Sequence, residues 1–470
     1  MHYLAHAFGQ RYELPIPLAL FIIGGAGVVF LSFLLILQRK VGKQNKKNID
    51  DIPFIAPLNT AWTLVSFIFL AFLIFAGLAG SQEVAENFLP VFFWLVIWVV
   101  VPLLCGVIGD WTQIFNPFAN IAKLADSSRL RKVVIGRSKA YVWPRWLGWW
   151  FAAVIYFALA CGELIFNESA TKPFNLALWL LVYLFISAFG GFLYGSSWLK
   201  RGEIFSVLYY TWGKLGYFRF GNSGERSFAG GLTVPFETST SRVVFVLLLL
   251  ASISFDGLLS TPLWSRFQHQ LPESFTIESL SYQLAASLIF AAVALFLWLL
   301  FSLFAKAVAN AGAINANSTK VLAGLLPSVL PISFGYLLAH YIEYLIVNGQ
   351  LFFPLIGNPI GKDSWPIHLP NPFNDDFHPN THLLPSAFYW YFAVIVIVIV
   401  HVVAVILAHR HLSSSSKNEQ IARRSEYPWI AAMVAYTMLS LWLLAQPLVK
   451  EKASKTESFA PSHSHIQLKG

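Results

Sequence analysis

The fold class follows from one stretch of the chain, residues 321–347, which has the sequence VLAGLLPSVLPISFGYLLAHYIEYLIV. A helix needs roughly 20 apolar residues to cross a hydrocarbon core of about 30 Å, and this stretch is long enough. Four polar side chains, Tyr336, His340, Glu343 and Tyr344, recur in it at helical spacing and span about 100° of one helix face. An ionisable side chain inside a membrane costs roughly 2.5–3.5 kcal/mol, so His340 and Glu343 indicate a functional site.

The composition places the chain among membrane proteins. Of its 470 residues 57% are hydrophobic and only 12% are charged, and the mean hydropathy is +0.62. Soluble domains carry about twice that share of charged residues. The 42 Phe and 17 Trp suit lipid-facing and interfacial surfaces. We therefore expect a polytopic membrane protein.

Ten apolar segments of about 20 residues predict ten membrane-spanning helices. Helices satisfy their own backbone groups in lipid, and the segments are too long for barrel strands. The expected fold is an all-α helical bundle, with a single membrane domain over residues 1–448 and a disordered tail over 449–470. The ten segments are residues 17–38, 58–80, 90–109, 146–166, 174–195, 243–264, 281–305, 321–347, 386–408 and 428–448.

The distribution of Lys and Arg predicts the orientation of the bundle. If the N-terminus lies outside, the cytoplasmic loops carry 24 of the 32 basic residues, and both termini are extracytoplasmic. The net charge of +9 then faces the anionic inner leaflet, and no nucleic-acid partner is expected. The predicted location is a bacterial inner membrane. The loops counted as cytoplasmic are residues 39–57, 110–145, 196–242, 306–320 and 409–427.

Neither a cleavable signal peptide nor a disulfide framework is expected. The basic cluster follows the first apolar segment instead of preceding it, and Cys105 and Cys161 both lie inside apolar segments. In the loop after the third segment, Asn116 and Pro117 form a good N-cap and first-turn pair, which predicts a short amphipathic helix on the cytoplasmic interface. The long outer loop 348–385 is expected to form a lid or vestibule.

Ionisable side chains within the apolar segments share one depth. Glu163, Asp256, His340 and Glu343 all fall within roughly 12 Å of the outer interface, and His6 precedes the first segment on that side. Carboxylates and imidazoles at one level suit zinc, manganese or iron, and a bound divalent ion turns its water into hydroxide near neutral pH. One expectation is therefore a divalent metal held by these five residues.

Structural interpretations compete with that expectation. Asp256 beside Ser252 would serve equally well to hydrogen-bond neighbouring helices, and Glu163 would reach water or pair with Arg11. We interpret His401 as a packing residue.

Three residues outside this group are also interpreted structurally. His409 and His411 are taken as ordinary interface residues. Glu203 is expected to pair with the basic residues just before it in its loop.

Short motifs scattered over residues 1–350 resemble bacterial polytopic membrane proteins of the fenitrothion hydrolase family. Each motif is short, and their order along the chain carries the resemblance. The motifs are His6 through Gly9, Arg11-Tyr12-Glu13-Leu14-Pro15-Ile16-Pro17, Asn116-Pro117-Phe118, Gly202-Glu203-Ile204-Phe205-Ser206-Val207-Leu208, Phe255-Asp256-Gly257-Leu258, Leu330-Pro331-Ile332, Ala339-His340-Tyr341 and Asn348-Gly349-Gln350.

The resemblance implies an integral membrane enzyme that hydrolyses an apolar, fenitrothion-like organophosphorus triester taken from the lipid. No catalytic residues are transferred from the family. Our own hypothesis is that Asp256, His340 and Glu343 hold a metal or orient water, with Glu163 and His6 as further ligands. Arg11 would polarise the phosphoryl oxygen.

Two other functions stay open. In a transporter or permease, Asp256 and His340 would relay protons, and the prolines of the eighth segment favour that reading because broken helices line transport sites. The remaining alternative is a non-catalytic subunit that works with a membrane partner.

Overall fold

The computed structural model describes residues 12–15, 17–36, 51–218, 230–233, 236–272, 275–415 and 419–450. Two residues of the predicted site, His6 and Arg11, lie outside these ranges, as does most of the predicted tail. Within the described residues, helices joined by loops make up the fold, and the strands are β1 (Tyr12–Glu13) and β2 (Val449–Lys450), which pair in parallel.

All ten predicted spans are confirmed as helices. Nine apolar segments of the described chain are long enough to cross a membrane, and α7 (Trp150–Leu164) is a shorter apolar helix. The long segments are α1 (Leu18–Ile36), α2 (Thr60–Ala79), the continuous run of α3 (Phe88–Val91), η2 (Phe92–Val100) and α4 (Val101–Ile108), α9 (Pro173–Tyr194), α12 (Thr240–Leu259), α14 (Leu280–Ala311), α15 (Ser318–Asn348), α17 (Ser386–Ser415) and α18 (Glu419–Leu448).

Shorter helices connect these segments. On the side of α15's C-terminus they are η1 (Val84–Glu86), α8 (Asn167–Ala170), α13 (Pro262–Gln270), η5 (Gly349–Leu351) and α16 (Phe352–Gly357). On the other side they are η3 (Thr112–Ile114), α5 (Pro117–Ala125), α6 (Ser128–Ile135), α10 (Ser196–Arg201), α11 (Ile204–Gly213) and η4 (Gly230–Thr233).

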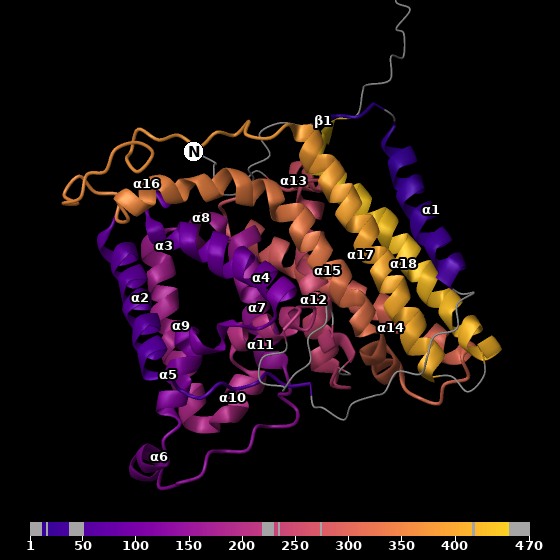
Figure 1. Cartoon of the computed structure of the whole chain (residues 1–470), viewed down its shortest axis with the longest axis horizontal. Coiled ribbons are helices and arrows are strands. Elements are labelled where there is room, and N and C mark those ends of the chain that lie inside the picture. The colour runs from indigo at the N-terminus through magenta and orange to yellow at the C-terminus, as the bar shows by residue number, and fades with distance from the viewer. Residues whose placement is uncertain are drawn as a thin grey trace, which may run out of the picture.

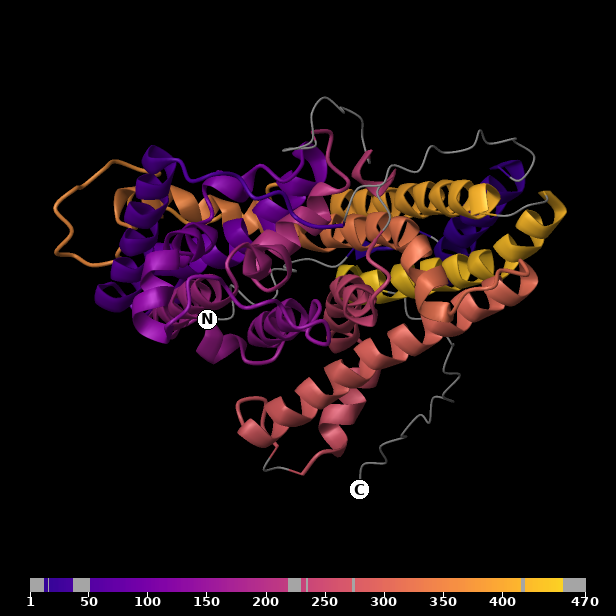
Figure 2. The ribbon, with the colours of Figure 1, turned by 90° about the horizontal axis from the view of Figure 1, so that it is seen from below.

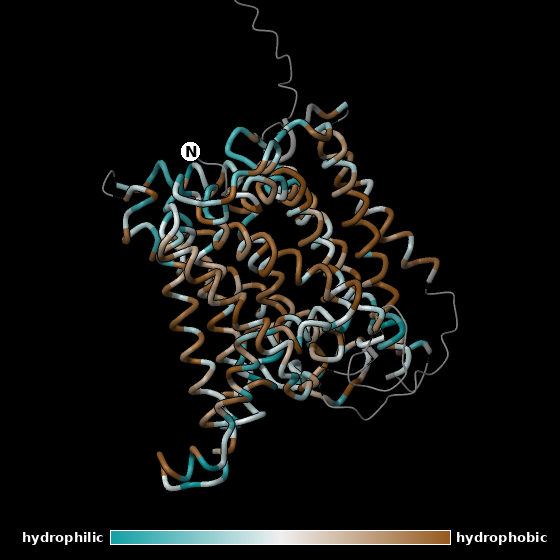
Figure 3. The backbone as a smooth tube through the Cα atoms, turned by 60° about the vertical axis from the view of Figure 1, so that its left-hand side comes forward, coloured by the Kyte–Doolittle hydropathy of each residue, from teal (hydrophilic) through white to brown (hydrophobic). Residues whose placement is uncertain are grey.

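The two sides of the bundle agree with the predicted topology. The β1–β2 pairing brings both ends of the described chain to one side, together with the loop after α16, while α6 and α10 lie at the opposite side (Figure 1). We call the side of β1 the outer side, because the basic loops lie at the other one. Figure 3 shows hydrophobic residues along the middle of the helices and hydrophilic ones toward both ends, as a bilayer requires.

Two helices form the centre of the bundle. Of the residues in the apolar segments of α12 and α15, 83% and 78% are buried, against 22% in α14. Figure 2 shows α14 running along the edge of the bundle, and its low buried share is what a helix exposed to lipid requires. Gly335 of α15 permits close packing on α17, since a Cβ there would lie 2.4 Å from Val400 Cγ1. Buried polar groups on α12 and α15 are therefore remote from lipid, and partners on neighbouring helices stabilise them.

The loop predictions hold in part. Asn116 caps α5, accepting hydrogen bonds from the backbone N–H groups of Phe118 and Ala119 at 3.0 and 3.2 Å. The segment 196–242, expected as a loop, contains the buried helix α11. Its apolar run is too short for the 20-residue criterion, which is why the sequence does not reveal it.

Candidate functional site

Helix α15 presents two neighbouring side chains to two different helices. His340 points to α12, where its Nε2 lies 2.6 Å from Asp256 Oδ2. Tyr341 points to α7, where its hydroxyl donates a hydrogen bond to Glu163 Oε1 at 2.5 Å. Consecutive helical residues diverge by about 100°, so one turn of α15 serves both carboxylates. Three of the residues singled out in the sequence, Asp256, His340 and Glu163, thus gather around one turn.

The Asp256–His340 pair, called the outer pair below, is buried. The side chains are 5% and 6% exposed, respectively. The short contact inside the bundle explains how two ionisable groups are accommodated at this depth, because each supplies a partner for the other. Asp256 thus joins α12 to a neighbouring helix, as the structural interpretation of this residue expects. The hydroxyl of Ser252 also reaches a neighbouring helix, because it lies 2.8 Å from the Tyr156 hydroxyl of α7.

Glu163 has a second hydrogen-bond donor from the third span. Trp98 Nε1 donates to Glu163 Oε2 at 2.6 Å. Trp98 belongs to η2, a nine-residue π-helix, and π-helical turns occur frequently at functional sites because they redirect side chains. The Trp98 ring also stacks on Tyr156, with centroids 5.3 Å apart. The carboxylate of Glu163 is therefore fixed by an indole and a phenol.

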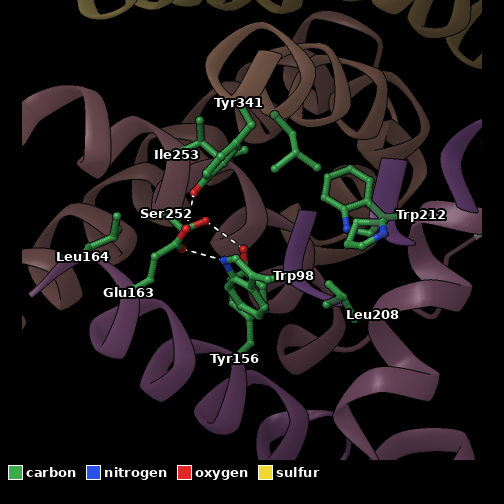
Figure 4. Close-up of a pocket in the computed structure, with 11 residues that line it drawn as sticks. Trp98, Tyr156, Glu163, Leu164, Leu208, Trp212, Ser252, Ile253 and Tyr341 are labelled. Carbon is green, nitrogen blue, oxygen red and sulfur yellow. Dashed lines mark hydrogen bonds between the residues drawn. The ribbon is translucent and has the colours of Figure 1, made fainter. Parts of the chain in front are cut away.

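These residues line a cavity inside the bundle. The cavity is small, with a volume of about 20 Å³, which is room for about one water molecule. Figure 4 shows Glu163, Trp98, Tyr156, Ser252 and Tyr341 around one part of it and the α11 side chains across from them. The lining is completed by Pro102, Leu164, Leu208, Trp212, Ile253 and Leu337. Asp256 and His340 do not line this space, and Glu163 is the carboxylate that does.

Glu343 is buried on α15 at 4% exposure, and it interacts electrostatically with Tyr389 of α17. Within the described residues, no group of three or more His, Cys, Asp or Glu side chains is placed to hold a metal. The donors themselves fit a metal poorly, because His340 Nε2 and Asp256 Oδ2 face each other directly and Glu163 is engaged by Trp98 and Tyr341. The metal set, with His6 outside the described ranges, stays a prediction.

A second buried His–carboxylate pair lies toward the inner side. His409 Nδ1 of α17 lies 2.9 Å from Glu426 Oε2 of α18, and the side chains are 5% and 2% exposed. The interpretation of His409 as an interface residue is therefore wrong. Both helices extend beyond the predicted spans, so two residues assigned to one loop are in fact inside the bundle. A usable signal was the spacing of His401 and His409, which are eight residues apart and lie on one helix face.

The interpretation of Glu203 is also wrong. Glu203 is fully buried and caps α11, accepting hydrogen bonds from the N–H groups of Phe205 and Ser206 at 3.1 and 2.7 Å. It also accepts from Asn116 Nδ2 at 2.8 Å and from the Tyr183 hydroxyl at 2.9 Å. A carboxylate at a helix N-terminus is favoured by the orphan N–H groups and the helix dipole. Glu203 thus has a structural role that joins the N-termini of α5 and α11.

Asp51 forms a further buried ionic cluster at the inner side. Its carboxylate accepts from Arg242 Nε and from Lys214 Nζ, each at 2.8 Å. Burial alone would raise the pKa of Asp51, but the two cations outweigh that effect and hold this pKa well below its usual range. The cluster ties the segment before α2 to α11 and α12.

Comparison with known proteins adds no assignment, since no family model, curated protein or solved structure matches this chain.

Proposed function

We propose that this protein is a membrane carrier that exchanges a small organic cation for a proton at Glu163. The integral membrane character of the chain rests on its apolar helices. The exchange is supported by one observation in particular, a carboxylate set among aromatic rings in a cavity inside the bundle. The substrate class and the coupling are proposals.

The lining of the cavity suits an organic cation for two reasons, and the cavity, which has room for about one water in this structure, widens in the proposed carrier to admit one. Aromatic faces attract cations through the ring quadrupole, by about 0.5–2 kcal/mol or more where water is excluded. Trp98, Tyr156, Tyr341 and Trp212 supply such rings, and Glu163 supplies the opposite charge. The Glu163 carboxylate itself is already oriented, because Trp98 and Tyr341 each donate a hydrogen bond to it.

Proton coupling follows from competition for one carboxylate. A cation bound in the cavity favours ionised Glu163, and a proton on Glu163 removes the charge that holds the cation. Each ligand therefore weakens the binding of the other by the same factor, as linkage requires. The outer pair lies close enough to Glu163 to interact with it electrostatically. In the proposed carrier, the protonation of the outer pair therefore changes the affinity of the cavity for the cation.

The test uses the purified full chain in proteoliposomes that contain a pH-sensitive dye. Benzyltrimethylammonium is the probe, because it carries a permanent charge and an aromatic ring. We expect its addition to drive proton movement in the wild type and in Glu168→Gln, an exposed carboxylate of α8, and to drive none in Glu163→Gln. Wild-type vesicles that show no probe-driven proton movement would refute the carrier. So would a Glu163→Gln variant that behaves like the wild type.

The same cavity supports hydrolysis of an organophosphorus triester as a second candidate. The aromatic rings would receive the aryl group, and Glu163 would take a proton from water as the oxygen attacks phosphorus and the aryl oxide leaves. The hydroxyl of Tyr156, a residue that lines the cavity, would donate to the non-bridging atom on phosphorus, which is sulfur in fenitrothion and oxygen in its oxo analogues. Colorimetric release of the nitrophenol from fenitrothion tests this role. Turnover by the wild type that is lost in Glu163→Gln would favour the enzyme, and an inactive wild type would remove it.

A further inference from the structure

We propose that a second cavity, called the α2 cavity, holds an acyl chain of an anionic phospholipid from the inner leaflet, with the lipid phosphate at Lys123. This cavity lies between α2, the third span, α5, α9 and α11. The third span separates it from the cavity at Glu163, because Ile97 and Val101 line the α2 cavity and Trp98 lines the other. The proposal therefore does not rest on the proposed carrier.

The size of the α2 cavity fits a hydrocarbon chain. Its volume is about 270 Å³, whereas an apolar cavity of about 150 Å³ is already enough to hold benzene and stays free of water. Its walls are nearly all apolar and include Leu70 and Leu73 of α2, Val101 of α4, Leu180 of α9 and Phe205 of α11. Each methylene group that enters such a space gains contacts with the protein that an empty cavity lacks.

The few polar side chains of this lining leave the space itself apolar. Its hydroxyl groups and its amide donate hydrogen bonds inside the protein instead of toward a ligand. The donors and acceptors are Ser66 Oγ to the Thr63 carbonyl oxygen at 2.8 Å, Thr112 Oγ1 to Asp110 Oδ1 at 2.9 Å, Asn116 Nδ2 to Glu203 Oε2 at 2.8 Å and the Tyr209 hydroxyl to the Ile97 carbonyl oxygen at 2.9 Å. A polar ligand would find little compensation there for the water that it loses.

The α2 cavity opens toward lipid. Helix α2 lies at the edge of the bundle (Figure 1), and only 33% of the residues in its apolar segment are buried. It packs chiefly on α9, α3 and α5. On the side of the third span, the lining residue Phe69 of α2 is 38% exposed, and Phe92, Ile97 and Val101 are half-buried. A chain from the surrounding bilayer therefore reaches the cavity between α2 and the third span without crossing water.

The inner end of the cavity lies at the level of lipid headgroups. The Phe115 ring lies between the rings of Trp62 and Trp111, with centroid distances of 4.6 and 5.9 Å. Phe115 and Trp111 both line the cavity. Tryptophan is enriched at the boundary between hydrocarbon and headgroups, so this aromatic cluster marks where an acyl chain ends and its headgroup begins.

A lysine is placed at that end. Lys123 Nζ of α5 donates to the carbonyl oxygen of Gln113 at 3.2 Å and to Asn120 Oδ1 at 3.4 Å. Gln113 follows Thr112 of the cavity lining, and Asn120 Nδ2 donates to Ser66 Oγ, another lining residue, at 3.3 Å. Lys123 is thus one residue removed from the lining on two sides.

Lys123 lacks an anion of its own among the described residues. The ion pairs of these residues do not include Lys123, and Glu203 acts on it only over a longer range. Burial lowers the pKa of Lys123, because the ammonium group is partly removed from water. A lipid phosphate would supply the missing negative charge. The inner leaflet carries the anionic lipids, and Lys123 lies on the side of the basic loops.

The experiment measures lipid binding to the purified full chain in a neutral detergent. A titration followed by native mass spectrometry gives the affinity for dioleoyl phosphatidylglycerol, which is anionic, and for dioleoyl phosphatidylcholine, which has the same chains and no net charge. Val101→Phe fills the cavity, and Lys123→Gln removes the cation. The matched controls are Val107→Phe, at an exposed position of α4, and Lys132→Gln, at an exposed position of α6.

We expect the wild type to bind phosphatidylglycerol at least about tenfold more tightly than phosphatidylcholine, whose choline group neutralises the phosphate. In Lys123→Gln this preference is expected to disappear, and Lys123→Arg is expected to keep it. In Val101→Phe the affinity for both lipids is expected to fall by about tenfold or more, because two or more methylene groups lose their place. Both controls are expected to behave like the wild type.

Three results would overturn the proposal. Equal affinity of the wild type for the two lipids, or a preference that persists in Lys123→Gln, would remove the phosphate from Lys123. Displacement of phosphatidylglycerol by inorganic phosphate would show a site for a free anion and no place for a chain. Wild-type affinity in Val101→Phe would remove the chain from the cavity.

The melting temperature of each variant without lipid separates lost binding from lost folding. If Val101→Phe melts well below the wild type, Leu180→Phe fills the same space from α9 and replaces it. Wild-type affinity in Leu180→Phe would then remove the chain from the cavity, and reduced affinity for both lipids would support it.

Discussion

Asp110 offers a test of the electrostatics of the inner side that is independent of any assigned function. The residue follows α4, outside the membrane-spanning segments, and is 7% exposed. Burial raises the pKa of its carboxyl from 3.8 to about 6, although Gln113 and Thr112 donate hydrogen bonds to it at 2.6 and 2.9 Å. The hydrogen bonds therefore do not fully compensate the loss of water.

The sign of the effect on stability follows from linkage. A carboxyl with a raised pKa in the folded state binds its proton more tightly when folded, so stability is lost as the pH rises from about 4 to about 6. The rise in the pKa of Asp110 from 3.8 to about 6 lowers the free energy of unfolding at neutral pH by about 3 kcal/mol. Asp110→Asn removes the negative charge of the carboxylate, so the free energy of unfolding rises by at most about 3 kcal/mol. Gln113 Oε1, which makes no hydrogen bond within the described chain, is able to accept from the new amide after a rotation.

The assay is the free energy of unfolding in mixed micelles, measured for the wild type and Asp110→Asn at several pH values. We expect the variant to be more stable by about 1–3 kcal/mol at pH 7.5, by roughly half as much near pH 5, and by no more than about 0.5 kcal/mol near pH 4. Asp363→Asn, an exposed carboxylate of the outer loop, is the matched control and is expected to have no effect. An Asp110→Asn variant that is less stable than the wild type at pH 7.5, or whose advantage does not change with pH, would refute the reasoning.

Two further predictions concern packing and charge. Asp51→Asn leaves Arg242 and Lys214 without the carboxylate that they share. We therefore expect the free energy of unfolding to fall by about 3–5 kcal/mol, and a fall of less than about 1 kcal/mol would contradict this reasoning. Gly191→Ala places a Cβ 2.2 Å from the backbone oxygen of Ala122, which separates α9 from α5 and costs about 1–3 kcal/mol in the same assay. Gly24→Ala in α1 meets nothing within 4 Å and is the control, so equal losses in the two glycine variants would refute the packing argument.

The sequence predicts the helices well because the membrane imposes one strong rule, about 20 apolar residues for each crossing. It predicts the limits of α17 and α18 poorly, since a helix continues past the hydrocarbon core wherever its polar residues find partners inside the bundle. His409 and Glu426 are the result: both were assigned to a loop because they are polar, and they meet because both helices extend. Helix α11 escapes detection for the opposite reason, since its apolar run is half the length that the rule requires.

The candidate site was predictable in its residues but not in its contacts. Depth along each span brings Glu163, Asp256 and His340 to one level, and the structure places them around one turn of α15. Depth carries no information on rotation about the helix axis, so it does not show that Glu343 lies near α17 or that Ser252 bonds to Tyr156. Nor does the sequence indicate the π-helix that aims Trp98 at Glu163, because that backbone geometry depends on packing in three dimensions.

The contacts of His340 distinguish a metal enzyme from a proton carrier in chemical terms. A metal needs the lone pair of an imidazole nitrogen and the oxygens of several carboxylates at one point, about 2.0–2.2 Å from the ion. In the outer pair, Nε2 and Oδ2 face each other at 2.6 Å, a separation that holds a hydrogen rather than an ion. Proton exchange uses this contact as it stands, whereas metal binding requires His340 and Asp256 to separate first. Metal binding at Glu163 would likewise require a contact to break first, because each of its two oxygens already accepts a hydrogen bond. A carboxylate held by an indole and a phenol remains able to exchange a proton for a cation, since neither donor has to leave when a ligand approaches from the cavity.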